Sequence, residues 1–396
     1  METINCGIAC RKNKTGLLSI EPTMPLNSMK ELSYIYAPTV GEISKKIEKD
    51  STESESLTIS GKTIAVISNG TAVLGYGDIG PLASLPVTEA KAFLMKNLGN
   101  VDAFPLCVNT QNAEEVIQTI SSIALGFRGI HLEDIKAPEC FYIEKELQRK
   151  LNIPVYHDDQ HGTSIVVLAA LINAVKIVKK EMDKIKIVIN GAGASGIATA
   201  KLLREAGATN ILLCDKFGIL NPADSSSLSN EYQKEVAGLI NSKNISGDLN
   251  EALSDADVFI GLSEGNVLTE QMIKNMKSEP IIFALAIPSP EVSPEIAVKA
   301  GAKVVATGLS EYPNQVNNLL VFPGLFRGVL DYGIRKITEQ MKLEIAGALA
   351  GLVTKDELTS EYIIPDALNP SIVPTVAEAI AMQGYMLNKS IVRQSG

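Results

Sequence analysis

The five cysteines of the sequence, Cys6, Cys10, Cys107, Cys140 and Cys214, include no CxxC pair. Structural zinc sites commonly contain such pairs, so the spacing gives no support to a zinc ribbon or finger. An odd number of cysteines also argues against a disulfide framework and fits free thiols in a reducing compartment. Tryptophan is absent as well, but its absence excludes no class of protein.

An excess of positive charge is also missing, because 45 acidic residues outnumber 36 basic ones and give a formal net charge of -9. This balance argues against nucleic acid or an anionic membrane as the main partner, although a locally positive site can still bind an anionic small molecule. The first residues lack the basic and apolar regions of a signal peptide. The most apolar run, Ile165–Ile172, is too short to cross a bilayer. We therefore expect a cytoplasmic protein that acts on a small molecule.

Short apolar runs alternate with longer helical patterns along the chain, which predicts an α/β protein with parallel sheets. We predict an N-terminal domain over residues 1–162, a Rossmann-type dinucleotide-binding domain over 163–375 and a helical C-terminal tail over 376–396. A helix over Thr163–Lys180 is expected to link the two domains, and the polar stretch Lys49–Gly61 predicts an exposed loop. The predicted strands are Thr63–Ser68, Ala103–Val108, Gly129–Asp134, Pro154–Asp158, Ile185–Asn190, Asn210–Asp215, Val258–Ser263, Ile281–Leu285 and Lys303–Gly308.

A glycine-rich turn follows one of these strands and precedes a helical pattern. It contains Gly191, Gly193, Ala194, Ser195 and Gly196, and it reads G-x-G-x-x-G in the strand–turn–helix setting of dinucleotide-binding sites. The glycines allow a tight turn and a close approach of the backbone to a pyrophosphate. The N-terminus of the following helix offers free N–H groups to the same phosphates. We therefore predict a dinucleotide site at this turn.

The end of the next strand indicates which dinucleotide is bound. Asp215 lies there, where a carboxylate accepts hydrogen bonds from the ribose hydroxyls and repels a 2′-phosphate. This favours NAD over NADP, although the neighbouring Lys216 weakens the preference. Ser263, which ends another predicted strand, is assigned to the same cofactor site.

Two pairs of acidic residues also stand at predicted strand ends, Glu133 with Asp134 and Asp158 with Asp159. The carboxyl ends of parallel strands meet at one edge of a sheet, where α/β proteins bind their ligands. Carboxylates that converge there would bind a hard divalent cation, Mg²⁺ or Mn²⁺. The alternative is that these acids only cap helices. His157 and His161 flank Asp159, but their spacing does not suffice for zinc, so we expect them to have a supporting role.

Five segments together resemble the small, mostly prokaryotic form of malic enzyme. They include "HLEDIKAPECFYIE" at His131–Glu144, "PVYHDDQHGTSIVVLAAL" at Pro154–Leu171 and "VINGAGASGIATAKLL" at Val188–Leu203. The segments Ile67–Leu94 and Tyr312–Gly328 complete the set, and the resemblance runs from about Gly16 to about Leu387. It implies metal-dependent oxidative decarboxylation of malate to pyruvate with reduction of NAD, and decarboxylation of oxaloacetate as a side activity.

The resemblance also implies roles for individual residues. Glu133, Asp134 and Asp159 match the family's metal ligands, whereas the role of Asp158 stays open. Lys91 matches the general base, and we expect burial and the cation to lower its pKa. Tyr36 matches the general acid, and Asn318 matches a residue that binds the substrate and borders the cofactor. The small malic enzymes are dimers whose N-terminal segment crosses to the partner, so we expect a homodimer or higher homo-oligomer in which Tyr36 acts in the neighbouring subunit's site.

Three departures from the family pattern leave alternatives open. Thr39 replaces a glycine near Tyr36, and two changes make the expected pocket less polar, Ile287 for an asparagine and Leu309 for an arginine. One alternative is the same chemistry on a less polar 3-carboxy-2-hydroxy acid. The other is a dinucleotide-binding protein that has lost its catalytic activity. The retained metal, base and acid positions argue against this second alternative.

Overall fold

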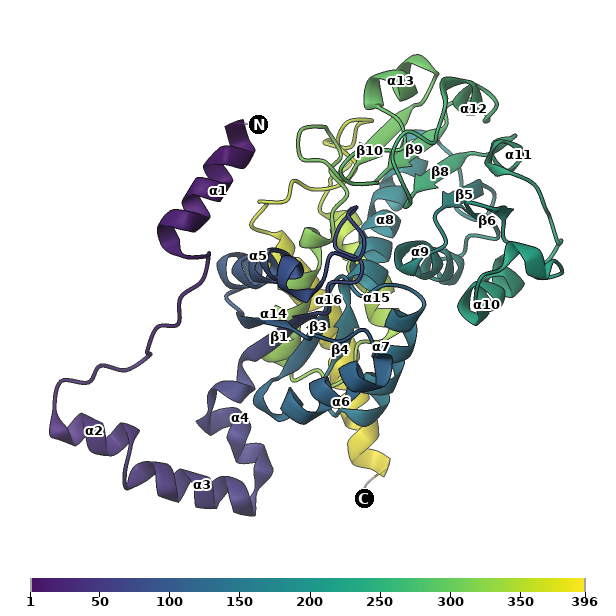
Figure 1. Cartoon of the computed structure of the whole chain (residues 1–396). Coiled ribbons are helices and arrows are strands. Elements are labelled where there is room, and N and C mark those ends of the chain that lie inside the picture. The colour runs from purple at the N-terminus through teal and green to yellow at the C-terminus, as the bar shows by residue number, and fades with distance from the viewer. Residues whose placement is uncertain (1, 395–396) are drawn as a thin grey trace.

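The computed structural model describes residues 2–394 and confirms the α/β class, with two sheets that are each flanked by helices (Figure 1). The first sheet has the strand order β2-β1-β3-β4, and all its pairs are parallel. Its central strand β1 is buried over its whole length, as expected for a sheet covered by helices on both faces. The strands are β1 Thr63–Ser68, β2 Asp102–Cys107, β3 Gly129–Leu132 and β4 Val155–His157.

The second sheet has the order β10-β9-β8-β5-β6-β7, and one of its pairs corrects the prediction of a purely parallel sheet. The short strand β7 runs antiparallel to β6. The chain reverses there because Asp215 accepts a hydrogen bond from the Phe217 N–H and Gly218 adopts a φ of 108°. A two-residue strand leaves no periodicity to detect in the sequence. The strands are β5 Lys186–Asn190, β6 Asn210–Asp215, β7 Gly218–Ile219, β8 Val258–Gly261, β9 Ile281–Ala284 and β10 Val304–Thr307.

The first helices form an arm that projects from the body of the molecule (Figure 1). The arm segment, residues 19–50, forms its hydrogen bonds within itself or with its immediate neighbours. The stretch 49–61, predicted as a loop, instead contains the end of α3 and short helical turns. The helices of this region are α1 Glu2–Lys14, α2 Met29–Ile35, α3 Thr39–Lys49 and α4 Ser54–Leu57.

Helix α8 links the two sheets, but it begins at Asp158 and not at Thr163 as predicted. The positive end of the helix dipole stabilises Asp158 and Asp159 in the first turn. Glu144 also accepts a hydrogen bond from the His157 N–H, at 3.0 Å, just before the helix begins. The other helices beside the sheets are α5 Pro81–Gly99, α6 Ala113–Ile123, α7 Glu139–Lys150, α8 Asp158–Ile177, α9 Ala194–Glu205, α10 Glu231–Ile240, α11 Leu249–Leu253, α12 Glu270–Lys274 and α13 Pro294–Lys299.

After β10 the chain returns to the first sheet. Phe322 and Phe326 of α14 (Phe322–Tyr332) belong to the same buried apolar cluster as Ile64 of β1 and Met95 of α5. Helix α16 (Ile372–Gln394) packs beside α14 and α15 (Glu339–Gly351), and α15 also packs against α8 (Figure 1). The predicted domain limits at residues 162 and 375 both fall inside helices, α8 and α16, so the domain division stays a proposal from the sequence.

One helix among the described residues, α8, is long and apolar enough to cross a membrane by length and composition alone. In the folded chain 72% of its apolar window is buried inside the protein, which is the usual position of a core helix.

Candidate active site

Lys91 lies on α5 and points towards the carboxyl edge of the first sheet, where it is surrounded by polar partners. Its side chain is 12% exposed. The Lys91 Nζ donates to Oδ2 of Asp158 at 2.5 Å and to Oδ1 of Asn318 at 3.1 Å. It also lies 3.2 Å from Oε1 of Glu133. The structure therefore brings together residues from positions 91, 133, 158 and 318, of which the sequence pattern alone had singled out only the acids.

Three carboxylates beside Lys91 form a second part of the site. Glu133 and Asp134 follow β3, Asp159 lies in the first turn of α8, and one oxygen of each lies within 4.8 Å of the others. Asp134 adopts a positive φ of 55°, and its buried Oδ2 has no hydrogen-bond partner among the described residues. Burial and then the neighbouring acids raise the pKa of Asp134 to about 9. Converging carboxylate oxygens are the ligands that Mg²⁺ and Mn²⁺ prefer.

The pKa of Lys91 depends on burial and on the neighbouring acids. Burial acts as predicted and lowers the pKa of this lysine. The carboxylates of Asp158 and Glu133 raise it by more, so the pKa lies above that of an ordinary lysine. The raising effect of Asp158 was not predicted, because its proximity to Lys91 arises only in the folded chain, whereas the lowering effect of a bound cation stays a prediction. In this structure Lys91 is a protonated ammonium group, and its positive charge compensates one negative charge of the neighbouring carboxylates.

Gly162 makes the close approach of Asp158 and Asn318 possible. A Cβ atom at this position would lie 2.2 Å from Oδ1 of Asp158 and 2.8 Å from Cβ of Asn318. Both distances are shorter than van der Waals contact, so a side chain here would separate the two residues that hold Lys91. Asn318 begins a short 3-10 helix before α14, beside Lys91. Asn318 contacts Lys91 and is not among the residues that line the cleft beside the glycine-rich turn, and its assignment to substrate and cofactor stays a prediction.

Three histidine side chains lie near the acids. His157, which was expected to support them, has its Nδ1 3.8 Å from Oδ2 of Asp159, and neither ring nitrogen has a hydrogen-bond partner among the described residues. Burial lowers the pKa of His131 to about 3, so its neutral ring shares a hydrogen bond of 2.7 Å with Glu133. His161 lies 2.9 Å from both carboxylate oxygens of Glu144 and 2.9 Å from Nζ of Lys342. Glu144 and Lys342 were missed because nothing in the sequence marks a charged helix residue as buried. Together they fix the helix turn that carries Asp158 and Asp159.

A cleft of about 780 Å³ opens at the glycine-rich turn, at the carboxyl edge of the second sheet. Of the predicted cofactor residues, Gly191, Gly193, Asp215 and Ser263 line it. Gly191 has a φ of 119°, and a Cβ atom there would lie 2.3 Å from the Leu262 carbonyl oxygen, so both the turn and its packing require glycine. The shape fits a dinucleotide laid across the strand ends.

The remaining cofactor residues lie beside the cleft. Gly196 packs under the turn, because a Cβ atom there would meet the Gly191 carbonyl oxygen at 1.7 Å. Ala194 begins α9 and packs against the core of the first sheet. Ser195 donates its hydroxyl to the backbone carbonyl of Asp159 at 2.8 Å. The start of the dinucleotide helix is therefore joined directly to a residue of the carboxylate cluster.

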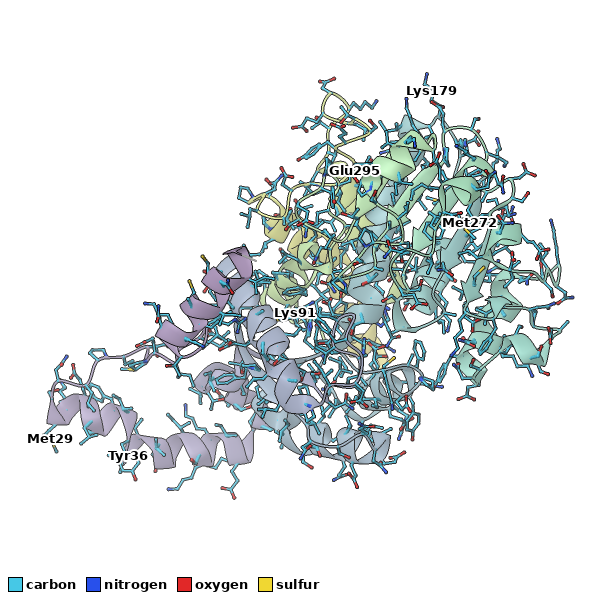
Figure 2. All side chains as sticks on the ribbon, turned by 45° about the horizontal axis from the view of Figure 1, so that its top comes forward. Met29, Tyr36, Lys91, Lys179, Met272 and Glu295 are labelled. Carbon is cyan, nitrogen blue, oxygen red and sulfur yellow. The ribbon has the colours of Figure 1, made fainter. Side chains whose placement is uncertain are left out.

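The structure does not bring Tyr36 to Lys91 within one chain. Tyr36 follows α2 in the arm segment, is 67% exposed, and lies far from Lys91 in Figure 2. Many other large apolar side chains of the arm are exposed as well, namely Ile20, Met24, Leu26, Met29, Leu32, Tyr34, Ile35 and Val40. An exposed apolar patch of this kind indicates a contact surface.

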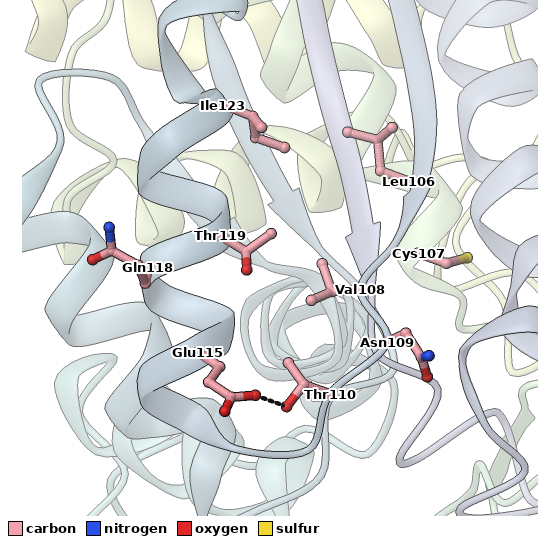
Figure 3. Close-up of a pocket in the computed structure, with 9 residues that line it drawn as sticks. All are labelled: Leu106, Cys107, Val108, Asn109, Thr110, Glu115, Gln118, Thr119 and Ile123. Carbon is pink, nitrogen blue, oxygen red and sulfur yellow. Dashed lines mark hydrogen bonds between the residues drawn. The ribbon is translucent and has the colours of Figure 1, made fainter.

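A second hollow, of about 520 Å³, lies between β2 and α6 (Figure 3). It has an apolar floor that includes Leu106, Val108 and Ile123, and Glu115 accepts a hydrogen bond of 2.6 Å from Thr110 at its rim. It shares no residue with either part of the site described above.

Comparison with known families agrees with this geometry. The family model "Malic enzyme, N-terminal domain" matches residues 16–148, and "Malic enzyme, NAD binding domain" matches residues 160–385. The chain belongs to the malic enzyme family. It is 47% identical over 370 residues to the NAD-dependent malic enzyme of Geobacillus stearothermophilus, covering 93% of this chain and 77% of that one. It is 46% identical to the bifunctional malic/malolactic enzyme of Bacillus subtilis, covering 93% and 90%.

A solved structure supports the malic enzyme fold of the whole chain. The NAD-dependent malic enzyme of Thermotoga maritima superposes with a TM-score of 0.91 at 42% identity, covering 94% of this chain and 98% of that one. The resemblance inferred from the sequence is therefore confirmed at the level of family and fold. Of the positions that depart from the malic enzyme pattern, Thr39 donates to the Ser33 carbonyl within the arm. The Ile287 carbonyl approaches Gly75, next to Leu74, whose N–H donates to Asp134 at 3.3 Å. The Leu309 N–H donates to the Thr307 hydroxyl at 3.2 Å, just after β10.

Proposed function

We propose that this malic enzyme oxidises malate with NAD and a divalent cation, releasing carbon dioxide and pyruvate. Oxidative decarboxylation of malate is the activity of the family. The observation that carries the proposal is the contact of Lys91 with Asp158 and Glu133, beside the carboxylates of Asp134 and Asp159. A base and a hard-cation site thus lie next to each other, as this reaction requires.

Glu133, Asp134 and Asp159 would hold the Mg²⁺ or Mn²⁺ ion. When bound, the cation supplies an electrophile that stabilises negative charge on the C2 oxygen, and the nicotinamide supplies the hydride acceptor. Lys91 would take the proton of the C2 hydroxyl after passing its own proton to Asp158, its partner at 2.5 Å. It becomes neutral once the charge of Glu133 and Asp159 is compensated, because those carboxylates contribute to its raised pKa. Asn318 would orient Lys91 towards the substrate.

The assignment of Tyr36 as the general acid requires a second subunit. We propose a cytoplasmic homodimer in which the arm segment of one chain reaches the site of its partner. A loop beside the carboxylates also has exposed apolar side chains. The Leu74 N–H of this loop donates to Asp134 at 3.3 Å. The side chains of Leu74 and Tyr76 are both more than half exposed. The apolar surfaces of the arm and of this loop are complementary in character, and covering both removes them from water.

A coupled assay tests the proposed function. With L-malate, NAD and Mn²⁺ the protein is expected to form NADH, measured by absorbance, and an excess of EDTA should abolish the signal. Asp159→Asn should raise the apparent Kd for Mn²⁺ about 100-fold, whereas Glu181→Gln, which removes an exposed charge, should not.

Because a proton competes for Asp134, whose pKa is about 9, Mn²⁺ affinity should increase with pH up to that value. Metal-independent NADH formation would reject the proposed site.

The preference for NAD over NADP is assigned to Asp215. Its Oδ1 already accepts from the Phe217 N–H at 2.7 Å, which fixes the carboxylate at the rim of the cofactor cleft. Asp215→Ala removes the charge that repels a 2′-phosphate and leaves Lys216 to attract one. It should raise the ratio of kcat/KM for NADP to that for NAD by about tenfold. Asp183→Ala, an exposed acid just before β5, serves as the control. An unchanged ratio would show that Asp215 does not select the cofactor.

The two alternatives considered from the sequence differ in their support. The Ile287 carbonyl approaches Gly75, the neighbour of Leu74 on the loop beside the carboxylates, and the Ile287 side chain is 38% exposed. A less polar substrate therefore stays an alternative to malate. The proximity of Lys91, Asp158 and Asn318 argues against a protein that has lost turnover.

A further inference from the structure

Glu291 is a buried carboxylate that the reaction described above does not use. It follows β9, precedes α13 and is 0% exposed. Its Oε1 accepts a hydrogen bond from the Ser263 N–H at 3.2 Å, and its Oε2 accepts one from the Ala286 N–H at 3.0 Å. Ser263 follows β8 and Ala286 follows β9, so one side chain joins the loops at the ends of two neighbouring strands.

The fold leaves space for this carboxylate at Gly261, the last residue of β8. A Cβ atom at Gly261 would lie 2.2 Å from Cδ of Glu291, closer than any two carbon atoms pack. Among the side chains that the structure describes, no Lys, Arg or His forms an ion pair with Glu291. Burial raises the pKa of Glu291, and hydrogen bonds from the backbone N–H groups of Ala286, Ser263 and Glu291 itself oppose that rise. In its ionised form the carboxylate is stabilised by backbone dipoles without a compensating side-chain charge, so its field extends into the surrounding site.

The two joined loops lie at one half of the cofactor cleft. In a Rossmann-type sheet the adenosine half of a dinucleotide lies over the first two strands and the nicotinamide half over the fourth and fifth. Here β5 and β6, which carry the glycine-rich turn and Asp215, take the first position, and β8 and β9 take the second. Ser263 lines the cleft, and its hydroxyl accepts from the Asn190 side chain at 2.8 Å. Glu291 thus stands behind the nicotinamide half.

We propose that Glu291 positions the loops that enclose the nicotinamide and that its carboxylate makes the protein bind oxidised NAD in preference to NADH. The inference rests on the proposed binding of NAD. The oxidised nicotinamide ring carries a positive charge and the reduced ring does not, so a nearby unpaired carboxylate in a poorly solvated site stabilises only the oxidised form. Tighter binding of NAD than of NADH favours the release of NADH, the product that must leave before the next turnover.

The test is equilibrium binding of NAD and of NADH to the purified chain, by calorimetry and by nucleotide fluorescence, without substrate. Glu291→Gln keeps the shape and removes the charge, whereas Glu291→Asp keeps the charge and alters the geometry. Glu291→Gln should shift the ratio of Kd for NAD to Kd for NADH about fivefold in favour of NADH. Glu291→Asp should weaken both and leave the ratio unchanged. Glu295→Gln removes an exposed charge from the same segment and should change neither value (Figure 2).

The ratio separates the proposed role from a merely structural one. If Glu291→Gln weakens both nucleotides equally, the carboxylate only holds the loops and the proposed preference is wrong. If neither affinity changes while thermal unfolding shows a folded protein, Glu291 does not position the nicotinamide half at all. Failure of the unmodified chain to bind either nucleotide would instead reject the proposed function. Should Glu291→Gln not fold, the two affinities of the unmodified chain decide, because tighter binding of NADH than of NAD would contradict the proposed preference.

Discussion

Replacing Lys91 by methionine is expected to lower kcat for malate oxidation by about 1000-fold. The side chain keeps its length and its apolar stem, but no group then remains beside Asp158 that can take the C2 proton. Decarboxylation of oxaloacetate needs no base at that oxygen, so it should continue in the same variant. The measurement is the ratio of the two activities under identical Mn²⁺ and pH conditions. The ratio separates loss of the base from general damage to the site.

Two further variants make the Lys91 experiment decisive. Lys91→Met leaves Asp158 buried without its cation, a change that commonly costs about 3–5 kcal/mol of stability. Adding Asp158→Asn removes both charges together and should restore much of the thermal stability without restoring malate oxidation. Lys96→Met lies on the same helix and removes a half-exposed ion pair with Asp102 and a hydrogen bond to Asn100, so it should retain near-normal activity. If Lys91→Met kept more than a tenth of the original kcat, Lys91 would not be the base.

The fold was predictable to a large extent because strands and turns leave local patterns. Every strand predicted from an apolar run is present to within two residues, and the G-x-G-x-x-G turn lines a cleft. The start of α8 was placed too late because Asp158 and Asp159 were assigned to a strand end. Their helical position depends partly on Glu144, a residue of another helix. Pattern reasoning cannot detect a partner that the chain supplies from elsewhere.

The site was predictable only where the sequence marks its residues or a family resemblance names them. The acids stood at strand ends, which is a physical signal, but Lys91 and Tyr36 were ordinary residues until the resemblance was considered. The direction of the Lys91 pKa could not be inferred, because it depends on the 2.5 Å contact with Asp158. Buried charged residues such as Glu291 and Lys342 were missed for the same reason: burial is a property of the tertiary structure.

A dimer of two inactive variants is expected to be active if Tyr36 acts across the subunit boundary. In a heterodimer of Tyr36→Phe and Lys91→Met chains, one site combines an intact Lys91 with the partner chain's intact tyrosine. Purified through two different tags, this heterodimer should have about half the activity of the unmodified dimer, although each homodimer is nearly inactive. If Tyr36 acted within its own chain, both sites of the heterodimer would lack one group and no activity would return.

The reciprocal heterodimer should be nearly inactive, and this result would show that activity in the first heterodimer comes from complementation between subunits. It combines an unmodified chain with a chain that carries both Tyr36→Phe and Lys91→Met. When Tyr36 acts in the neighbouring site, the unmodified chain's Lys91 meets phenylalanine and the other site lacks its lysine, so the heterodimer should be nearly inactive. Action within one chain would leave one complete site and about half the activity. The exposed position of Tyr36 at the end of α2, outside the body that holds Lys91, favours the first outcome. Subunit exchange during the assay would blur both results, so each heterodimer is re-purified through both tags after measurement and its composition checked.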